Sequence, residues 1–406
     1  MLRKTAQFPK KGSFALQSIV IIMFSKPQPF ILILIIAVTV LCTSCADSPH
    51  VESTAKVTVP SAEPSATPSP SPTPTEYTVT VTAGGDLLIH DTIYNSARKS
   101  DGSYDFSPVF SEVEYLFSEA DLAIVNLEVP VAGNLFVPSN FPLFNSPPEL
   151  LDAVKNMGID IVSTANNHAL DKGLVGLQET IKNATDRGIA VVGTYLTEDT
   201  RPLIVEKNNI KLGVASYTYG TNGIPLPSSA PYCVNLIDWD KILADIAYMK
   251  EEAVDFIICN MHFGNEYQIK QNAAQEDLVN FLFKNGVDVI FGSHPHVPQP
   301  MDERMTTLPD GSEKKVFVVY SMGNLVAYQK DYYTKLGGIA SVTLSKKGAE
   351  TKLLESTITP IYTHRDSKGF KVLPLEKTMQ QYEPGSSEYA RYKKMLEDVN
   401  KIFDGN

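Results

Sequence analysis

The sequence has little cysteine, no excess of positive charge and no apolar run long enough to cross a membrane. Four cysteines occur in 406 residues, and two of them, Cys42 and Cys45, lie at the end of the longest apolar run. Since only Cys233 and Cys259 remain, a disulfide framework cannot hold the fold together, although a single bridge between these two stays open. No internal repeat is apparent.

Acidic side chains outnumber basic ones in this chain. The formal net charge is −11, and because five basic and no acidic residues precede Cys45, the remainder carries −16. Such an excess of negative charge repels phosphate backbones and argues against nucleic-acid binding as the main role. Metal ions and cationic groups remain suitable partners. The hydrophobic fraction of 43% supplies a sizeable core, which excludes wholesale disorder.

Residues 1–45 are typical of an export signal. Residues 30–41 form an uncharged apolar run of twelve, preceded by basic residues and followed by small residues up to Cys45. Twelve is short against the ~20 residues of a membrane span, and the arrangement is that of a signal peptide. A cysteine at the cleavage point is what bacterial lipoprotein processing requires. We therefore expect lipidation of Cys45, although Cys42 stands where such signals usually carry leucine.

Two alternatives remain for this segment. An uncleaved signal anchor would also tether the protein to the outer face of the membrane, whereas soluble secretion would not. Met23 is an alternative start, because the segment that begins there has the length of an ordinary signal. Lipidation and the anchor both predict the extracytoplasmic face of the cell membrane.

Residues 46–76 are predicted to be a linker. They are rich in proline, serine and threonine and lack the apolar residues needed to offset the entropy of ordering. Proline favours extended conformations of about 3 Å per residue, so the linker can hold the following domain well away from the membrane.

From Tyr77 onward the pattern predicts an α/β domain. Strands rich in β-branched residues alternate with segments of helical period, which indicates a largely parallel sheet covered by helices. Residues 202–206 with 211–217, and 338–345 with 351–361, are predicted antiparallel pairs, so the sheet is mixed or there are two sheets. The charged segment 388–403 predicts a peripheral terminal helix. The other predicted strands are 77–83, 122–125, 159–163, 189–192, 256–259, 287–291 and 316–320, and the predicted helices are 108–119, 148–157, 174–187, 239–252 and 274–285.

Polar side chains follow five of these strands at the point where each strand ends. The motifs are Gly84-Gly85-Asp86, Asn126-Leu127-Glu128, Asn166-Asn167-His168, Asn260-Met261-His262 and Gly292-Ser293-His294-Pro295-His296. In open α/β sheets, ligands bind in the crevice beyond the carboxyl ends of the strands. Five strands therefore deliver aspartate, glutamate, asparagine and histidine to one edge.

The histidines favour a metal site at this edge. Four of the seven in the chain, His168, His262, His294 and His296, lie in these motifs. Imidazole and carboxylate ligands suit Mn, Fe, Zn or Ni. If residues 294–296 are extended, both histidine rings face one cavity, because residues i and i+2 project to the same side and Pro295 disfavours helical geometry before it.

The ordered motifs resemble the CapA family of bacterial capsule or poly-γ-glutamate synthesis proteins. The series is Gly-Asp, Asn-Leu-Glu, Asn-Asn-His-x-x-Asp, His-Phe-Gly-x-Glu-Tyr, Gly-x-His-Pro-His and Tyr-Ser-x-Gly-Asn. That family is similar to the calcineurin-like metallophosphoesterases. The resemblance implies a four-layer α-β-β-α sandwich with two mixed sheets over residues 77–362, and leaves residues 363–406 as a C-terminal extension.

The resemblance also implies a set of ligands for one or two divalent ions, Mn, Fe or Zn. The matching residues are Asp86, Glu128, Asn167, His262, His294 and His296. His168 matches the neighbouring histidine that acts as proton donor or transition-state stabiliser. Glutamate replaces the usual bridging aspartate at position 128. Leu88 stands where the Asp-x-His start would place a histidine, the nearest being His90, so the first metal position loses a ligand.

Further residues are candidates for the cavity. Asp171 would orient the ring of the predicted proton donor if its segment starts a helix, and a helix cap is the alternative. Glu266 lies four residues after His262, within reach on one helical turn, as a partner of that ligand or a contact for cationic or amide groups of a substrate. A solvated charge is the alternative for Glu266. Tyr267 and Asn324 are predicted to contact substrate from the cavity wall.

Three functions remain open. The first is a metal-dependent hydrolase or transferase that acts on amide or phosphoester bonds of an extracellular anionic polymer such as poly-γ-glutamate. The second is a tethered, non-catalytic accessory protein that helps capsule synthase membrane subunits build, export or hold the polymer, with a structural metal site. A metal-scavenging lipoprotein is the third, and it is disfavoured because the ligands come from five strands and not from clustered loops.

Overall fold

The structure is a computed structural model that describes residues 74–406. The predictions for the signal segment, for lipidation of Cys45 and for almost all of the linker lie outside these residues. No helix within residues 74–406 is both long enough and apolar enough to span a bilayer.

The elements of the described residues follow one another mainly as strand and helix. The strands are β1 (Glu76–Leu87), β2 (Leu122–Leu127), β3 (Ile161–Ser163), β4 (Ala190–Val192), β5 (Leu203–Lys207), β6 (Ile210–Thr218), β7 (Phe256–His262), β8 (Val289–Ser293), β9 (Pro298–Thr307), β10 (Glu313–Met322), β11 (Asn324–Val326), β12 (Leu336–Lys347), β13 (Glu350–Asp366) and β14 (Gly369–Pro374). The helices are α1 (Asp91–Ala97), α2 (Ser107–Phe110), α3 (Glu114–Ser118), α4 (Glu149–Asn156), α5 (Gly173–Thr185), α6 (Trp239–Glu251), α7 (Ala273–Lys284), α8 (Leu375–Met379) and α9 (Ser387–Phe403), with a short 3-10 helix at Tyr333–Lys335.

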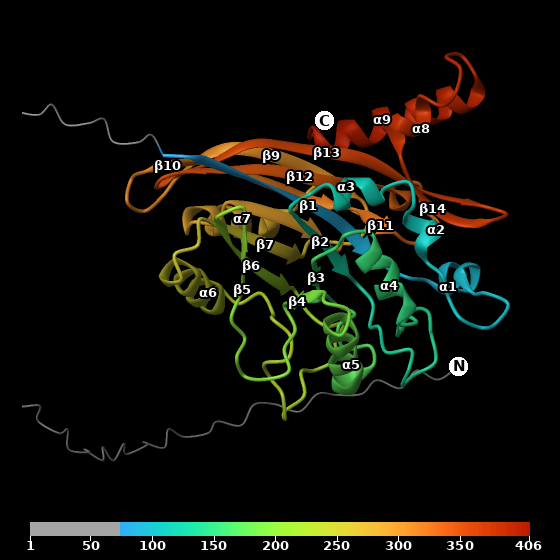
Figure 1. Cartoon of the computed structure of the whole chain (residues 1–406), viewed down its shortest axis with the longest axis horizontal. Helices are drawn as coiled ribbons and strands as arrows, with labels where there is room; N and C mark the ends of the chain where they lie inside the picture. Colours follow the sequence, from blue (N-terminus) through green and yellow to red (C-terminus); the bar gives the residue numbers. More distant parts are fainter. Residues whose placement is uncertain (1–73) are drawn as a thin grey trace, which may run out of the picture. The chain divides into compact units, whose positions relative to one another are not determined.

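The strands form two mixed sheets (Figure 1). In the first sheet the order is β14-β13-β12-β1-β2-β3-β4, with β11 paired to β1. Its strands β1 to β4 run parallel, whereas β12, β13 and β14 are antiparallel to their neighbours. In the second sheet the order is β5-β6-β7-β8-β10-β9, and the parallel strands β6, β7, β8 and β10 lie between antiparallel edge strands.

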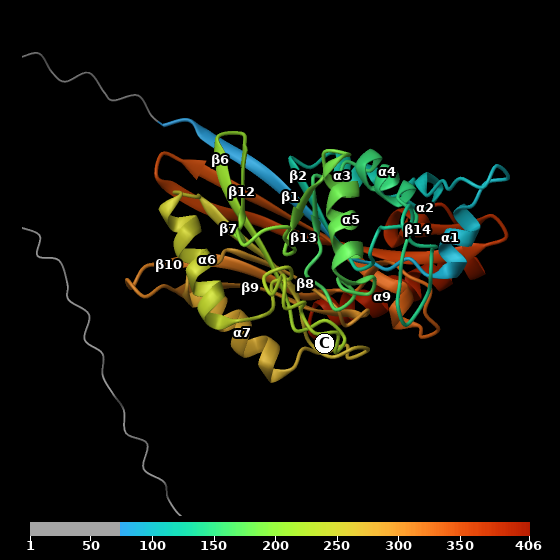
Figure 2. The same ribbon diagram turned by 90° about the horizontal axis from the view of Figure 1, so that it is seen from below.

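Helices cover the outer face of each sheet, so the predicted four-layer α-β-β-α sandwich is confirmed (Figures 1 and 2). Three apolar cores separate the four layers. Phe117 and Leu150 pack in the core between the first sheet and its helices. Val81 and Phe291 lie between the two sheets, and Leu282 of α7 packs on the outer face of the second sheet. Burial of this apolar surface is the main favourable term in folding.

The antiparallel pairs form as predicted, but one predicted helix needs correction and one edge strand was missed. Residues 108–119 form two short helices, α2 and α3, because the turn between them is closed by i to i+3 hydrogen bonds such as that from Val113 N–H to the Phe110 carbonyl. Strand β9 was not predicted. Its prolines argue against a central strand, but β9 is the edge strand of the second sheet, where proline is tolerated.

The C-terminal segment is more deeply integrated than expected. Strand β13 runs past residue 362 to Asp366, and β14 adds a further strand to the first sheet. Helix α9 forms where predicted, but it is not peripheral. Its buried side chains in the core between the sheets are Tyr392, Met395, Val399 and Phe403. These positions repeat at helical spacing, so one apolar stripe of α9 packs inward while its charged face meets solvent.

Both cysteines of the described residues are free. Cys233 and Cys259 are buried and unbonded, so the bridge that the sequence left open does not form. Packing, and not covalent cross-linking, holds the described domain together.

Candidate metal centre

Parallel pairing of β1 with β2 brings two carboxylates to one strand edge. Asp86, near the end of β1, lies opposite Asn126 of β2. Glu128 follows β2 directly, and its N–H donates to the Leu87 carbonyl at 3.2 Å. Because neighbouring parallel strands end at the same edge, side chains far apart in sequence lie together there.

A glycine fixes the backbone that carries Asp86. A Cβ atom at Gly85 would lie 1.9 Å from the carbonyl oxygen of Gly323, a distance that no side chain can occupy. The Asp86 N–H donates to that same carbonyl at 3.0 Å. Gly85 therefore permits the close approach of the chain before β11 and sets the position of the aspartate.

The second sheet supplies three histidines to the same edge. His262 ends β7 and lies opposite Ser293 of β8, after which His294 and His296 follow. The rings of His294 and His296 lie with their centroids 6.2 Å apart. The sequence suggested that residues 294–296 are extended, but they are not. His294 has φ 100° and His296 has φ 59°, so two left-handed residues, and not strand alternation, turn both rings inward.

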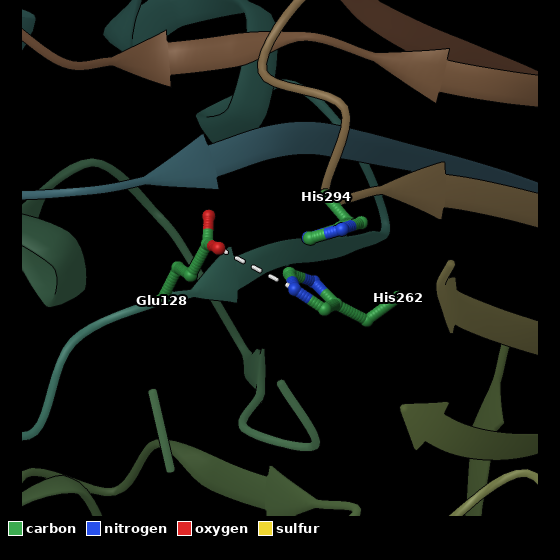
Figure 3. A group of neighbouring side chains, drawn as sticks. All are labelled: Glu128, His262 and His294. Carbon is green, nitrogen blue, oxygen red and sulfur yellow. Dashed lines mark ion pairs between the residues drawn. The ribbon is translucent and has the colours of Figure 1, made fainter. Parts of the chain in front are cut away.

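Two groups of ligand atoms share Glu128. Glu128, His262 and His294 form one group, shown in Figure 3, and Asp86, Glu128 and His296 form the other. Within each group the ligand atoms all lie within 4.8 Å of one another. Glu128 Oε1 is 3.4 Å from His262 Nε2, and Oε2 is 3.6 Å from His296 Nδ1. Each carboxylate oxygen thus faces a different group, as in a bridging ligand.

Three of the candidate ligand atoms lack hydrogen-bond partners in the described part of the chain. Within residues 74–406, neither oxygen of Glu128 nor Nδ1 of His294 has a hydrogen-bond partner, although both side chains are buried. A buried polar atom without a partner costs about 1–3 kcal/mol, and more when it is charged. Divalent cations bound here would satisfy these atoms, and the nitrogen and oxygen donors suit Mn, Fe or Zn.

Burial also sets the protonation of these ligands. It raises the pKa of Glu128 well above its ordinary value, and the charge of Asp86 adds to that effect. Burial lowers the pKa of His262 well below its ordinary value and that of His294 to about 3. Both rings are therefore neutral at physiological pH, the form that binds a metal.

Two asparagines contact the ligands. Asn167 Oδ1 lies 2.9 Å from His262 Nε2, the ring atom that also faces Glu128. The sequence did not single out Asn126. Its Nδ2 donates to Asp86 Oδ1 at 2.8 Å and lies 3.3 Å from His262 Nδ1, so it links the two groups. Asn126 belongs to the same strand-end motif as Glu128, so the sequence showed its position but not its contacts.

His168 is held by two neighbours. Its Nδ1 lies 2.7 Å from Asp171 Oδ2, which also accepts from the Phe144 N–H at 2.8 Å. The contact is made in a turn before α5 and not in a helix. The rings of Phe144 and His168 meet edge to face at 4.8 Å. These contacts fix the orientation of the His168 ring. Asp171 contacts Nδ1, so Nε2 is the ring nitrogen that remains available to a substrate.

The model of one protein family, the bacterial capsule synthesis protein PGA_cap, matches residues 80–329, which include every ligand described above. The chain belongs to this family. It is 26% identical over 262 residues to the PGA biosynthesis protein CapA of Bacillus subtilis, covering 63% of this chain and 65% of that protein. It is also 26% identical over 280 residues to the capsule biosynthesis protein CapA of Bacillus anthracis, covering 66% and 65%. The chain thus spans about 65% of the length of each of these relatives.

Among solved structures, the calcineurin-like phosphoesterase YfkN of Bacillus subtilis is similar over 80% of this chain and 100% of that chain, with 17% identity and a TM-score of 0.43. The relatives in sequence confirm the resemblance to capsule synthesis proteins.

In this PGA_cap protein, His90 does not replace the ligand missing at Leu88. Leu88 is buried in the core under the first sheet. His90 Nδ1 lies 3.1 Å from the Tyr328 N–H and 3.2 Å from the Leu88 carbonyl oxygen, and its ring packs edge to face on Phe144. Burial lowers the pKa of His90 to about 4. Among residues 74–406, neither ligand group includes it.

Glu266 and Tyr267 lie beside the centre, but the predicted helical turn does not bring them there. They occupy an irregular segment between β7 and α7, so no helical turn connects Glu266 to His262. Glu266 is exposed, and its charge contributes to the raised pKa of Glu128. Tyr267 is half-exposed, and its ring centroid lies 6.1 Å from that of His296.

Asn324 is not an open part of the cavity wall. It is buried, with 1% of its surface exposed, and its Nδ2 donates to the His296 carbonyl oxygen at 3.1 Å. Its side-chain hydrogen bonds are to protein groups, among them the candidate ligand residue His296, so the structure does not support the predicted contact with substrate.

Tyr219 is a neighbour of the centre that sequence reasoning missed. Its ring lies parallel to that of His262 with centroids 6.2 Å apart, and its centroid is 4.5 Å from that of His294. Its N–H donates to the His262 carbonyl at 3.0 Å, and 48% of the residue is exposed. Tyr219 directly follows β6, so the strand-end rule would have found it had it been applied to a sixth strand.

Proposed function

We propose that this chain is a membrane-tethered, extracytoplasmic protein of capsule or poly-γ-glutamate synthesis, whose metal centre hydrolyses or transfers an anionic polymer. The observation that carries the proposal is the sharing of Glu128 between two ligand groups in a member of the PGA_cap family. The names of the two relatives support the biosynthetic context. Capsule synthase membrane subunits are the proposed partners.

The ligand groups indicate where divalent ions would be held. Asp86, Glu128 and His296 would hold one ion, and Glu128, His262 and His294 the other. Ions held by these residues would lower the pKa of a bound water and would offset negative charge on a substrate oxygen.

His168 is the proposed proton donor to the leaving group. When Asp171 accepts a hydrogen bond from Nδ1–H, the second exchangeable proton of the imidazolium is on Nε2. Phe144 packs on the ring and limits its rotation. A histidine oriented in this way can deliver a proton from one fixed atom, a contribution of typically 10²–10⁴-fold in rate.

A non-catalytic accessory role is the second candidate. The ligand side chains are nearly closed to solvent, with Asp86 and Glu128 at 0% exposure and the histidines at 2–3%. Structural metal sites are closed, whereas catalytic sites keep one position open to water or substrate. In that case the ions would stabilise the domain, and the polymer would bind elsewhere.

Substitution of His168 and His296 separates the two functions. If the centre is catalytic, His168→Ala should retain bound metal, while turnover of poly-γ-glutamate or of a generic phosphodiester falls by about 10²-fold or more. His296→Ala should lose metal affinity, because it deletes a ligand. Metal analysis and turnover are measured on the same full-length preparations.

If the centre is structural, the pattern changes. His168→Ala should then be silent in a capsule assay, whereas His296→Ala should lower thermal stability and capsule output together. A pair of variants that leaves metal content, stability and polymer unchanged would contradict both functions.

A further inference from the structure

The side-chain amide of Asn324 is held in one orientation. Its Nδ2 lies within hydrogen-bond distance of three acceptors: the His296 carbonyl oxygen at 3.1 Å, Gln329 Oε1 at 3.0 Å and the Thr334 carbonyl oxygen at 2.8 Å. An amide nitrogen only donates, so these acceptors fix which end of the amide is the oxygen. Oδ1 is thereby directed to His296 Nδ1, at 3.2 Å.

Three oxygens surround that single ring nitrogen. Asp86 Oδ2 lies at 3.2 Å, Asn324 Oδ1 at 3.2 Å and Glu128 Oε2 at 3.6 Å from His296 Nδ1. One N–H can donate a well-directed hydrogen bond to only one of them. Ligands that bind a common ion at about 2.0–2.2 Å lie roughly 3.0–3.5 Å from one another, which is close to the observed spacing.

We propose that Asn324 Oδ1 is the fourth protein ligand of the ion held by Asp86, Glu128 and His296. This inference rests on the metal centre of the proposed function but not on catalysis. The resemblance to metallophosphoesterases left this position one ligand short, because Leu88 stands where a histidine is expected. Asn324 restores the number of ligands from a different strand, β11.

The other ligand group shares three of these four ligand types. Asn167 Oδ1 is 2.9 Å from His262 Nε2, which is 3.4 Å from Glu128 Oε1. Each ion would therefore have one oxygen of Glu128, one amide oxygen and one imidazole. The fourth ligand is His294 in one group and Asp86 in the other.

The two positions then differ in chemistry. The group with Asp86 and Asn324 offers three oxygens and one nitrogen, whereas the group with His262 and His294 offers two of each. Oxygen-rich sites suit harder ions such as Mn²⁺, and imidazole-rich sites suit Zn²⁺ or Fe. We expect Mn²⁺ to prefer the Asn324 position and Zn²⁺ the other.

The test is a titration of the metal-free full-length protein with Mn²⁺, followed by counting of the bound ions. The wild type should bind two, and Asn324→Ala should bind one with unchanged affinity and the second at least 10-fold more weakly. Gln329→Ala is the matched control, because it removes an acceptor of the same amide nitrogen but no ligand. It should bind two ions as the wild type does.

A structural role for Asn324 gives a different result. Asn324→Ala would then lower the melting temperature of the metal-free protein but still bind two ions with wild-type affinity, and that outcome overturns the proposal. If the variant does not fold, a crystal structure of the wild type with Mn²⁺ decides. An anomalous peak about 2.0–2.4 Å from Asn324 Oδ1 supports the assignment, and a peak more than about 3 Å away refutes it. Two bound ions without turnover would refute only the catalytic function.

Discussion

Asp171 shows how one buried carboxylate can set the behaviour of a neighbouring histidine. The same oxygen accepts from the His168 ring and from the Phe144 N–H, so it joins the ring to the loop that packs on it. Asp171→Asn leaves one acceptor oxygen and introduces an amide NH₂ that cannot accept. We expect turnover to fall by about 10²-fold or more while metal content is unchanged, measured as kcat alongside metal analysis. Unchanged kcat in a folded, metal-loaded variant would contradict a positioning role.

Tyr219 covers part of the centre. Its ring lies over His262 and His294 and is half-exposed on the other side. We expect Tyr219→Ala to release bound metal to a chelator several-fold faster, because water gains access to the ligands. Tyr219→Phe keeps the ring and removes only the hydroxyl, so its rate should match the wild type. Equal release from all three proteins would show that the ring does not limit access.

At the level of single residues, the sequence revealed ligand types better than their contacts. Asp86, Glu128 and His262 were singled out because each lies at or directly after the carboxyl end of a buried strand, a pattern visible in one dimension. Asn126 and Phe144 were missed as partners, because their contacts depend on strand register and on loop packing. Periodicity alone does not contain that information.

Among the elements, α9 makes the clearest test of packing. Phe403 is 1% exposed and lies in the core between the sheets, whereas Lys401 on the same helix is exposed. Phe403→Ala should lower the free energy of unfolding by about 3–5 kcal/mol, the usual cost of removing a buried phenylalanine. Lys401→Ala, the control, should change it by less than about 0.5 kcal/mol. Urea unfolding measures both changes. A similarly small effect of the two substitutions would contradict the packing of α9 in the core.

The strands were more predictable than their ends and edges. Fully buried strands such as β2 and β7 stand out as apolar runs, and parallel pairing follows from their alternation with helices. The edge strand β9 is half polar and contains proline, so its sequence does not differ from that of a loop. The four-layer arrangement came from the family resemblance, since alternation alone left one sheet or two.

For the whole molecule, the described domain extends beyond the boundary expected at residue 362. Limited proteolysis of the full chain should cut within residues 46–73, whose composition predicts a linker, and leave a fragment that reaches about Phe403. A chain that ends at residue 362 should not fold, because it lacks β14 and the apolar face of α9. Stable folding of that shortened chain, or a protease-resistant fragment ending near 362, would contradict this account.

Attachment to the membrane is a separate prediction. If Cys45 carries the lipid, Cys45→Ser should abolish incorporation of a radiolabelled fatty acid and, because processing requires that cysteine, leave the signal segment uncleaved. If residues 1–45 act as an uncleaved anchor, the wild type should incorporate no label and the substitution should change nothing. Fractionation and labelling of cells that express the full chain decide between them.

The most direct test of the central claim is the number of divalent ions bound by wild-type protein and by Glu128→Gln. Because Glu128 faces both ligand groups, we expect two ions per wild-type chain and a loss of affinity of at least 10-fold for both in the variant. Glu206→Gln, which changes an exposed carboxylate on β5, should bind two ions as the wild type does. A wild-type chain without stoichiometric metal, or a Glu128→Gln chain that binds two ions with unchanged affinity, would contradict a centre built on Glu128.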